Sequence, residues 1–293
     1  MIINQHSPSS IIKAWQSFLD SQGFPAGSPD GIWGPNTAQA TKDFQQASNL
    51  AADGIPGPQT IEAASSKGFS VPEATQFAPA GNLNAVFDIS HLNASVDLAK
   101  AKAEGMLAVF HKATQSIGAN LFHDKTYPDR RKDAQKAGLL WGAYHFGTSG
   151  DGKAQADAFL DYAQPDGNTL LVLDFERATT QGETSMTIQE ARDFVNQVKA
   201  RTGKFPGIYG GALLKAATAT AADPVLSQCW LWIAEYENEP RLPNGWSTYA
   251  FWQFTDGTHG NGALPVDGIG RCDRDLFRGS AVELTSFWAG NGV

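Results

Sequence analysis

The chain has 293 residues, of which 42% are hydrophobic, 18% charged and 11% aromatic, a composition typical of a folded globular protein. Its net charge of −8 argues against nucleic acid as a partner, because binding to phosphates depends on Lys and Arg. No apolar run reaches the roughly 18 residues of a membrane-spanning helix, and the start lacks the pattern of a signal peptide. We therefore expect a monomer made in the cytoplasm, with no membrane insertion.

The first part of the chain, residues 1–69, contains an internal repeat. DGIWGPNTAQA begins at Asp30, and DGIPGPQTIEA begins at Asp53, 23 residues later. Each copy offers Gly for a tight turn and a Thr that can cap the following helix. Apolar residues recur at helical spacing before and between the copies. The pattern predicts three short helices joined by two similar turns, an all-α domain.

This pattern resembles the three-helix peptidoglycan-binding module, whose signature is a Gln in the first helix, DGxxGxxT, a helix with Phe-Gln, and a second DGxxGxxT. The matches are Gln16, residues 30–37, Phe44-Gln45 and residues 53–60. The resemblance implies that peptidoglycan is the partner of residues 1–69. Residues 70–84 contain two prolines and small residues without a helical period, and they are predicted to form a linker.

From residue 85 onward, β-rich runs alternate with amphipathic helical stretches. The apolar runs cover residues 85–90, 106–113, 139–146, 169–176, 206–211, 229–236 and 250–255. Near-continuous apolar runs are typical of strands that are buried on both faces of a parallel sheet. We expect an α/β domain over residues 85–293: an irregular (β/α) TIM-like barrel of about eight strands, with its later helices shortened or lost.

Acidic side chains follow several of these runs, at the strand ends where barrel enzymes carry their reacting groups. Asp174 and Glu176 are two residues apart, so on a strand both side chains leave the same face. Two carboxyls in apolar surroundings shift each other's pKa, so that one can keep a proton while the other stays ionised. Glycoside hydrolysis requires such a pair. Alternatively, the two acids cap a loop or pair with Arg177.

The second part resembles the family 25 glycoside hydrolases, the lysozymes or N-acetylmuramidases. AVFDISHLN, VFHKATQS, AGLLWGAYHF, LVLDFE, GIYGG, WLWIAEY, FWQFTDG and CDRDLFRG occur in that family's order. The resemblance implies four cleft acids: Asp88, Asp174, Glu176 and Asp273. It implies that Glu176 is the general acid and that Asp174 orients the substrate's 2-acetamido group, which attacks its own anomeric carbon. Asp88 and Asp273, on neighbouring first and last strands, would hold sugar hydroxyls.

Two departures from the family pattern concern the site. The family often has Lys-Ala-Thr-Glu-Gly after its second strand, whereas this chain has Gln115 and Ser116 in the last two positions. The final motif offers Asp275 as an alternative to Asp273. Seven further side chains near strand ends are candidate substrate-binding groups: Lys112, Tyr144, Tyr209, Trp232, Tyr236, Trp252 and Gln253.

No metal site or cofactor is expected. His91, His111 and His145 lack zinc-binding spacing, and no phosphate-binding loop or nucleophile elbow occurs. Cys229 and Cys272 are expected to be buried free thiols, although the sequence leaves a disulfide between them open.

The sequence thus predicts a phage-type endolysin that cleaves the β-1,4 bond between N-acetylmuramic acid and N-acetylglucosamine and reaches the cell wall after release. Three alternatives remain: a secreted toxin with the same activity, a chitinase-like hydrolase, and a non-catalytic glycan-binding protein. A chitinase normally shows a longer DxxDxDxE run, whereas the residues before Asp174 are apolar.

Overall fold

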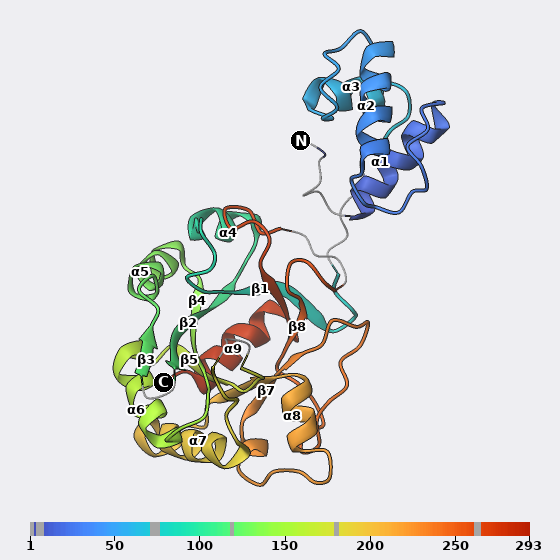
Figure 1. The fold of residues 1–293 in the computed structure, drawn as a ribbon. Coiled ribbons are helices and arrows are strands. Elements are labelled where there is room, and N and C mark those ends of the chain that lie inside the picture. Colours follow the sequence, from blue (N-terminus) through green and yellow to red (C-terminus); the bar gives the residue numbers. More distant parts are fainter. Residues whose placement is uncertain (1–2, 4–8, 71–76, 118–119, 179–181, 261–264) are drawn as a thin grey trace. The chain divides into compact units, whose positions relative to one another are not determined.

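A computed structural model describes residues 3, 9–70, 77–117, 120–178, 182–260 and 265–293 of the chain. The chain divides into two compact units, Met1–Phe77 and Ala78–Val293 (Figure 1). Residues 71–76 of the predicted linker lie outside the described residues, and residues 82–84 already belong to the first strand. No helix among the described residues is both long and apolar enough to cross a membrane.

The first unit contains the three predicted helices, α1 (Ser9–Ser21), α2 (Pro35–Ala47) and α3 (Pro58–Ser65). Its core is built on aromatic side chains that pack edge to face, because Trp15 meets Phe44 at a centroid distance of 5.8 Å and Phe69 at 5.0 Å. The helical apolar spacing in the sequence therefore corresponds to a real buried face.

Two matching hydrogen-bond networks hold the repeated turns of this unit. The side-chain amide of Gln16 forms hydrogen bonds with four residues of the first copy: Asp30, Gly31, Ile32 and Thr37. The side-chain amide of Gln45 forms the equivalent four bonds in the second copy, with Asp53, Gly54, Ile55 and Thr60. All eight distances lie between 2.8 and 3.1 Å.

The predicted capping by threonine is wrong. The N-caps of α2 and α3 are Gly34 and Gly57, each followed by a proline. The hydroxyls of Thr37 and Thr60 instead accept hydrogen bonds from the glutamine amides, so they tie each helix start to the preceding helix.

The second unit is an α/β barrel. Eight strands form a closed ring in the order β1 (Asn82–Ile89), β2 (Ala108–Ile117), β4 (Leu140–Phe146), β5 (Thr169–Asp174), β6 (Gly207–Gly210), β7 (Trp230–Ala234), β8 (Phe251–Thr255) and β9 (Asp273–Arg278). The pairing of β1 with both β2 and β9 closes the ring. A further strand, β3 (Asn120–His123), forms a hairpin with β2.

The parallel arrangement ends at the last strand, which is a departure from the all-parallel sheet expected from the apolar runs. Strands β1 to β8 pair in parallel around the ring, but β9 is antiparallel to both β8 and β1. No helix among the described residues connects β8 to β9, and without a crossover the chain can return only in the opposite direction. The amino end of β9 therefore lies beside the carboxyl ends of β8 and β1.

After α7 (Ile188–Thr202) the helices between strands are short or absent among the described residues, as expected, but the first of them, α4 (Leu98–Glu104), is short as well. The longer helices are α5 (Tyr127–Ala137), α6 (Gly152–Ala163) and α7; the shorter ones are α4, α8 (Ala212–Ala217) and the 3-10 turn η1 (Leu226–Gln228). Residues 235–250, which join β7 to β8, form no helix. A terminal helix, α9 (Ala281–Asn291), places buried Trp288 against Phe110 in the barrel interior, with ring centroids 5.3 Å apart.

Candidate active site

A pocket of about 320 Å³ opens at the carboxyl ends of the parallel strands. All four predicted acids line it, and so do six of the seven predicted substrate-binding side chains. The lining residues are Asp88, Ser90, Leu92, Lys112, Tyr144, Phe146, Asp174, Glu176, Tyr209, Trp232, Tyr236, Gln253 and Asp273. We call this pocket the cleft. Acids from the first, middle and last strands thus meet in one place.

Asp88 and Asp273 face each other across the junction that closes the barrel. They are register partners in the antiparallel pairing of β1 with β9, so both reach the same end of the barrel. Gln253 Nε2 donates a hydrogen bond of 2.8 Å to Asp88 Oδ2. Burial and the neighbouring Asp273 raise the pKa of Asp88 well above its ordinary range, and burial, aided by Asp256, raises the pKa of Asp273 to about 7.

Asp174 and Glu176 leave the end of β5 toward Lys112. Burial, reinforced by the Glu176 charge, raises the pKa of Asp174 well above its ordinary range. Burial also raises the pKa of Glu176, and the Lys112 ammonium partly offsets this effect at both carboxyls. Among the described residues, Arg177 makes no salt bridge with either acid, so the alternative of a surface ion pair has no support here.

Asp275 is not the cleft acid of β9. Its side chain is fully buried and accepts a 2.7 Å hydrogen bond from the Trp232 indole nitrogen. Because side chains alternate along a strand, Asp273 and Asp275 share one face, but Asp273 lies at the strand end and reaches the cleft. Asp275 lies one step deeper, beside Val86.

Two tyrosine hydroxyls and an amide form a hydrogen-bonded group beside Asp88. Tyr209 and Tyr236 both donate to Gln253 Oε1, at 2.9 and 2.8 Å. Gln253 in turn donates to Asp88, so one side chain connects two strand-end tyrosines to a cleft acid. Trp232 also lines the cleft, and its ring packs on Phe110 at 4.4 Å, which makes it part of the barrel core as well.

Trp252 does not belong to this group. It is buried but does not line the cleft, and its indole nitrogen donates a 2.6 Å hydrogen bond to the Glu235 carbonyl. Its neighbours Phe251 and Gln253 face the barrel interior, so the strand pleat turns Trp252 outward, toward Tyr249. The strand-end position alone did not reveal the face.

The departure at Gln115 changes the surroundings of Lys112. Lys112 Nζ donates a hydrogen bond of 2.5 Å to Gln115 Oε1, and it lies 4.8 Å from the centre of the Phe146 ring. The Gln115 amide donates to both oxygens of Glu183, at 3.2 and 3.3 Å. Gln115 therefore connects Lys112 to a carboxylate from the segment after β5, a contact that the sequence pattern did not indicate.

A second cavity of about 480 Å³ adjoins the cleft and shares Glu176, Tyr209 and Tyr236 with it. Its lining includes Glu235 from the end of β7, which is buried and forms salt bridges with Lys215 and, at 2.8 Å, with Arg241, two cations that the sequence did not point to. These two cations lie in a short helix and a loop, where no motif marks them. Glu176 thus stands at the junction of two adjoining spaces.

His111, His145 and the two cysteines are buried and do not line the cleft. Burial lowers the pKa of both His111 and His145 to about 4, and His145 shares hydrogen bonds with Thr114 and Gln155. Within the described ranges, no group of three or more potential ligands could hold a metal ion. Cys229 and Cys272 are both buried and free, as expected.

Comparison with known proteins agrees with this geometry. Residues 87–263, more than half of the chain, match the model of glycosyl hydrolases family 25. The chain belongs to this family. Residues 8–64 match the peptidoglycan binding domain model. Lysozyme M1 from Streptomyces globisporus is 31% identical over 67% of this chain and 68% of its own length.

Solved structures of family members extend the match to the fold. A bacterial lysozyme from Streptomyces coelicolor has a TM-score of 0.60 at 28% identity, covering 70% of this chain and 97% of its own. A muramidase from Trichobolus zukalii has a TM-score of 0.58 at 32% identity, covering 70% and 98%. The family 25 enzyme is therefore a glycoside hydrolase.

Proposed function

We propose that this enzyme is an N-acetylmuramidase, which cleaves the β-1,4 bond from N-acetylmuramic acid to N-acetylglucosamine in peptidoglycan. The observation that carries the proposal is the position of Glu176. It lines both the cleft and the adjoining cavity, as expected of an acid that protonates the oxygen between two bound sugars. The similarity to lysozymes and a muramidase supports this choice of substrate.

Glu176 is proposed as the general acid. Its pKa is raised because it is buried, so it retains its proton closer to neutral pH than an exposed glutamate. When the glycosidic bond breaks, this proton passes to the leaving oxygen, and Glu176 becomes a carboxylate. The same carboxylate can then accept a proton from the water that completes hydrolysis.

Asp174 is proposed to steer the 2-acetamido group of the muramic residue. Its Oδ1 is buried and has no hydrogen-bond partner among the described residues, a costly state that a substrate N–H would relieve. Held this way, the acetamido oxygen attacks the anomeric carbon as the leaving oxygen departs, giving an oxazolinium ion. Water then opens this ring, so no bond forms between enzyme and sugar.

Asp88 and Asp273 are proposed to hold sugar hydroxyls. Since their pKa values are raised, either can carry a proton and donate a hydrogen bond, whereas an ionised carboxylate can only accept. Tyr209 and Tyr236 offer ring surfaces at the same junction, suited to packing on sugar rings.

The N-terminal module is proposed to bind the same polymer and raise the local concentration of the catalytic unit. A single monomeric chain with one binding module and one hydrolytic unit suits an endolysin released to lyse a bacterial cell wall. A secreted toxin would use the same chemistry.

The test is to digest purified peptidoglycan, reduce the products with borohydride and identify the sugar alcohol. Muramitol is expected. Glucosaminitol would assign the other glycosidic bond, and freed stem peptides would indicate an amidase. Chitin oligosaccharides serve as the parallel substrate, because efficient cleavage there would favour the chitinase-like alternative. If neither polymer gains reducing ends, the protein is a glycan-binding protein without catalytic activity.

A further inference from the structure

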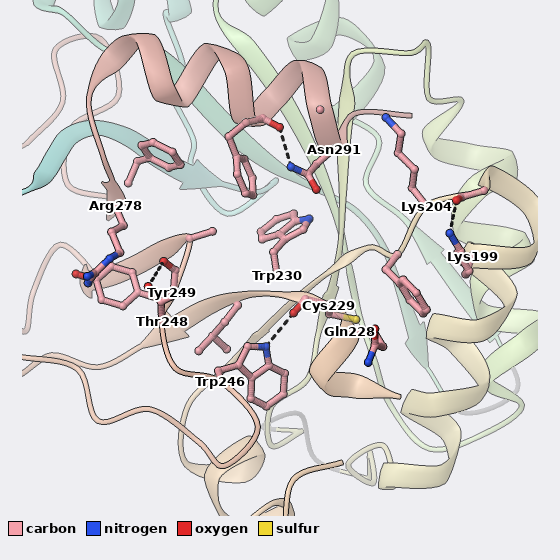
Figure 2. Close-up of a pocket in the computed structure, with 17 residues that line it drawn as sticks. Lys199, Lys204, Gln228, Cys229, Trp230, Trp246, Thr248, Tyr249, Arg278 and Asn291 are labelled. Atoms are coloured by element: carbon pink, nitrogen blue, oxygen red, sulfur yellow. Dashed lines mark hydrogen bonds between the residues drawn. The ribbon is translucent and has the colours of Figure 1, made fainter. Parts of the chain in front are cut away.

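A cavity of about 740 Å³ lies at the end of the barrel opposite the cleft. It is bounded by the amino ends of β7 and β8, the carboxyl end of antiparallel β9, the last turn of α7 and helix α9 (Figure 2). We call it the basal pocket. Its volume falls within the range of about 300–1,000 Å³ that is usual for ligand sites.

The two tryptophans of the barrel unit that are only partly buried both line the basal pocket. Of the six tryptophans in this unit, Trp141, Trp232, Trp252 and Trp288 are buried, whereas Trp230 and Trp246 are only partly buried, and both line this pocket. Partly buried Phe205 and Phe287 lie in the same wall. Trp230 also packs on Phe251 and Phe287, at 5.5 and 5.6 Å, so only part of its ring is exposed to the pocket. The exposed parts of these rings are suited to packing on the apolar faces of sugar rings.

Gly207 leaves room for the Trp230 ring because it has no side chain. A Cβ atom added at Gly207 would lie 2.3 Å from the Trp230 ring, so the indole lies directly against the β6 backbone. Among the described residues, the Trp230 indole nitrogen has no hydrogen-bond partner, while that of Trp246 donates 2.8 Å to the Cys229 carbonyl. Trp230 therefore keeps a donor available within the pocket.

Cations border the pocket, and its lining contains no acid. Lys199, Lys204 and Arg278 line it, and none of the three forms a salt bridge with a described carboxylate. Lys204 donates 2.6 Å to the Gly292 carbonyl, and Arg278 lies 5.5 Å from the centre of the Tyr249 ring. Figure 2 shows Trp230 between Arg278 on one side and the two lysines on the other. In a chain of net charge −8, this pocket is locally positive.

The basal pocket is separate from the cleft. Trp230 and Trp232 are two residues apart on β7, and the Phe110 ring packs on both, at 6.3 and 4.4 Å. Phe251 also packs on Phe110, at 5.2 Å, which fills the barrel interior between the two ends. A ligand in one site cannot extend through the barrel into the other.

We propose that the basal pocket is a second carbohydrate site, which binds an acidic segment of the peptidoglycan polymer. A sugar ring packs on Trp230 and Trp246, and carboxylates of the segment pair with Lys204 and Arg278. The proposal rests on peptidoglycan being the substrate. Its consequence is that the catalytic unit holds the wall at two places, with one strand in the cleft and another at the base, independently of the N-terminal module.

The experiment uses the full chain labelled with 5-fluorotryptophan and follows fluorine NMR during titration. The probe is the disaccharide N-acetylglucosaminyl-N-acetylmuramic acid, which carries one carboxylate, and the neutral comparison is di-N-acetylchitobiose. Resonances of the two pocket tryptophans are assigned with Trp230→Phe and Trp246→Phe. The matched variants are Lys204→Gln/Arg278→Gln and, as a control with equal charge loss on exposed helix positions, Lys136→Gln/Lys153→Gln.

The expected result is a saturable shift of the Trp230 and Trp246 resonances with the acidic disaccharide, with chitobiose binding about tenfold more weakly. The pocket double variant should lose about the same factor, and the control variant should lose none. Because the readout needs no turnover, its failure is distinguishable from a failure to hydrolyse peptidoglycan.

Three outcomes would overturn the proposal. The first is a shift confined to the Trp232 resonance, since that ring lines the cleft. The second is equal affinity for the neutral and acidic disaccharides. The third is a shift with poly(glycerol phosphate) but none with the disaccharide, which would assign the pocket to a phosphate polymer.

Discussion

Replacing Asp273 with Asn should stabilise the barrel at alkaline pH while lowering its activity. Burial raises the pKa of this carboxyl from 3.8 to about 7 in the folded chain. A carboxyl with a raised folded pKa binds its proton more tightly when folded, so it favours folding below pH about 4. That contribution is lost as the pH rises through about 7. Asparagine has no proton to lose and should escape the loss.

The magnitude follows from the shift. One pKa unit corresponds to about 1.4 kcal/mol, so a shift of roughly three units makes ionised Asp273 cost up to about 4 kcal/mol above pH 7. In a unit of this size, each kcal/mol changes the melting temperature by about 2–4 °C. We therefore expect Asp273→Asn to raise the melting temperature at pH 8 by at most about 8–16 °C and to leave it nearly unchanged at pH 4.

Differential scanning calorimetry at pH 4, 6 and 8 measures this, because it can resolve separate transitions of the two units. Asp133→Asn, which removes an exposed carboxyl on α5, is the matched control and should behave as wild type. A stability gain of the same size at pH 4 and pH 8 would refute the reasoning, because the effect would then come from packing and not from ionisation.

Glu176→Gln should fold normally and lose turnover on the order of a thousandfold in the peptidoglycan digestion assay. The control Glu239→Gln, at an exposed position, should retain wild-type turnover. An active Glu176→Gln enzyme would disprove the role of Glu176 as general acid. Gln45→Ala leaves several buried polar groups without a hydrogen-bond partner and should lower the unfolding free energy of the N-terminal module by about 2–4 kcal/mol. In calorimetry the module should then unfold at a lower temperature, while the barrel transition stays unchanged. Gly207→Ala should destabilise the barrel by about 1–3 kcal/mol through its clash with Trp230, and an unchanged melting temperature would contradict that seating.

The sequence predicted the elements well where residues repeat with a period. The helical spacing of the apolar residues around Trp15, and of those around Phe44, identified two helices. Apolar runs such as Leu170 to Leu173 identified strands, because periodicity follows burial. The direction of β9 was not predictable in this way, because alternation along a strand is the same in parallel and antiparallel pairing. The absence of a crossover helix before β9 was the available signal.

For the site, the order of the strands in the chain was enough to predict that the four acids lie close together. It was not enough to predict which face of a strand a side chain leaves or which side chains it contacts. The Asp88–Asp273 contact followed from barrel closure, which makes first and last strands adjacent. Trp252 and Gln253 were both predicted to line the cleft, but adjacent residues on a strand face opposite sides, and only Gln253 reaches it. The Gln115–Glu183 contact and the cations around Glu235 join segments by tertiary packing alone, which no local pattern encodes.

The antiparallel return of β9 sets the order in which the active enzyme can be assembled. During synthesis β1 emerges early, but its Asp88 has no facing carboxyl until Asp273, 185 positions later, has been made and paired. A nascent barrel is therefore an open sheet with two bare edges, β1 and β8, and an incomplete set of acids. Closure of the ring and completion of the set of four cleft acids therefore depend on the same strand, β9.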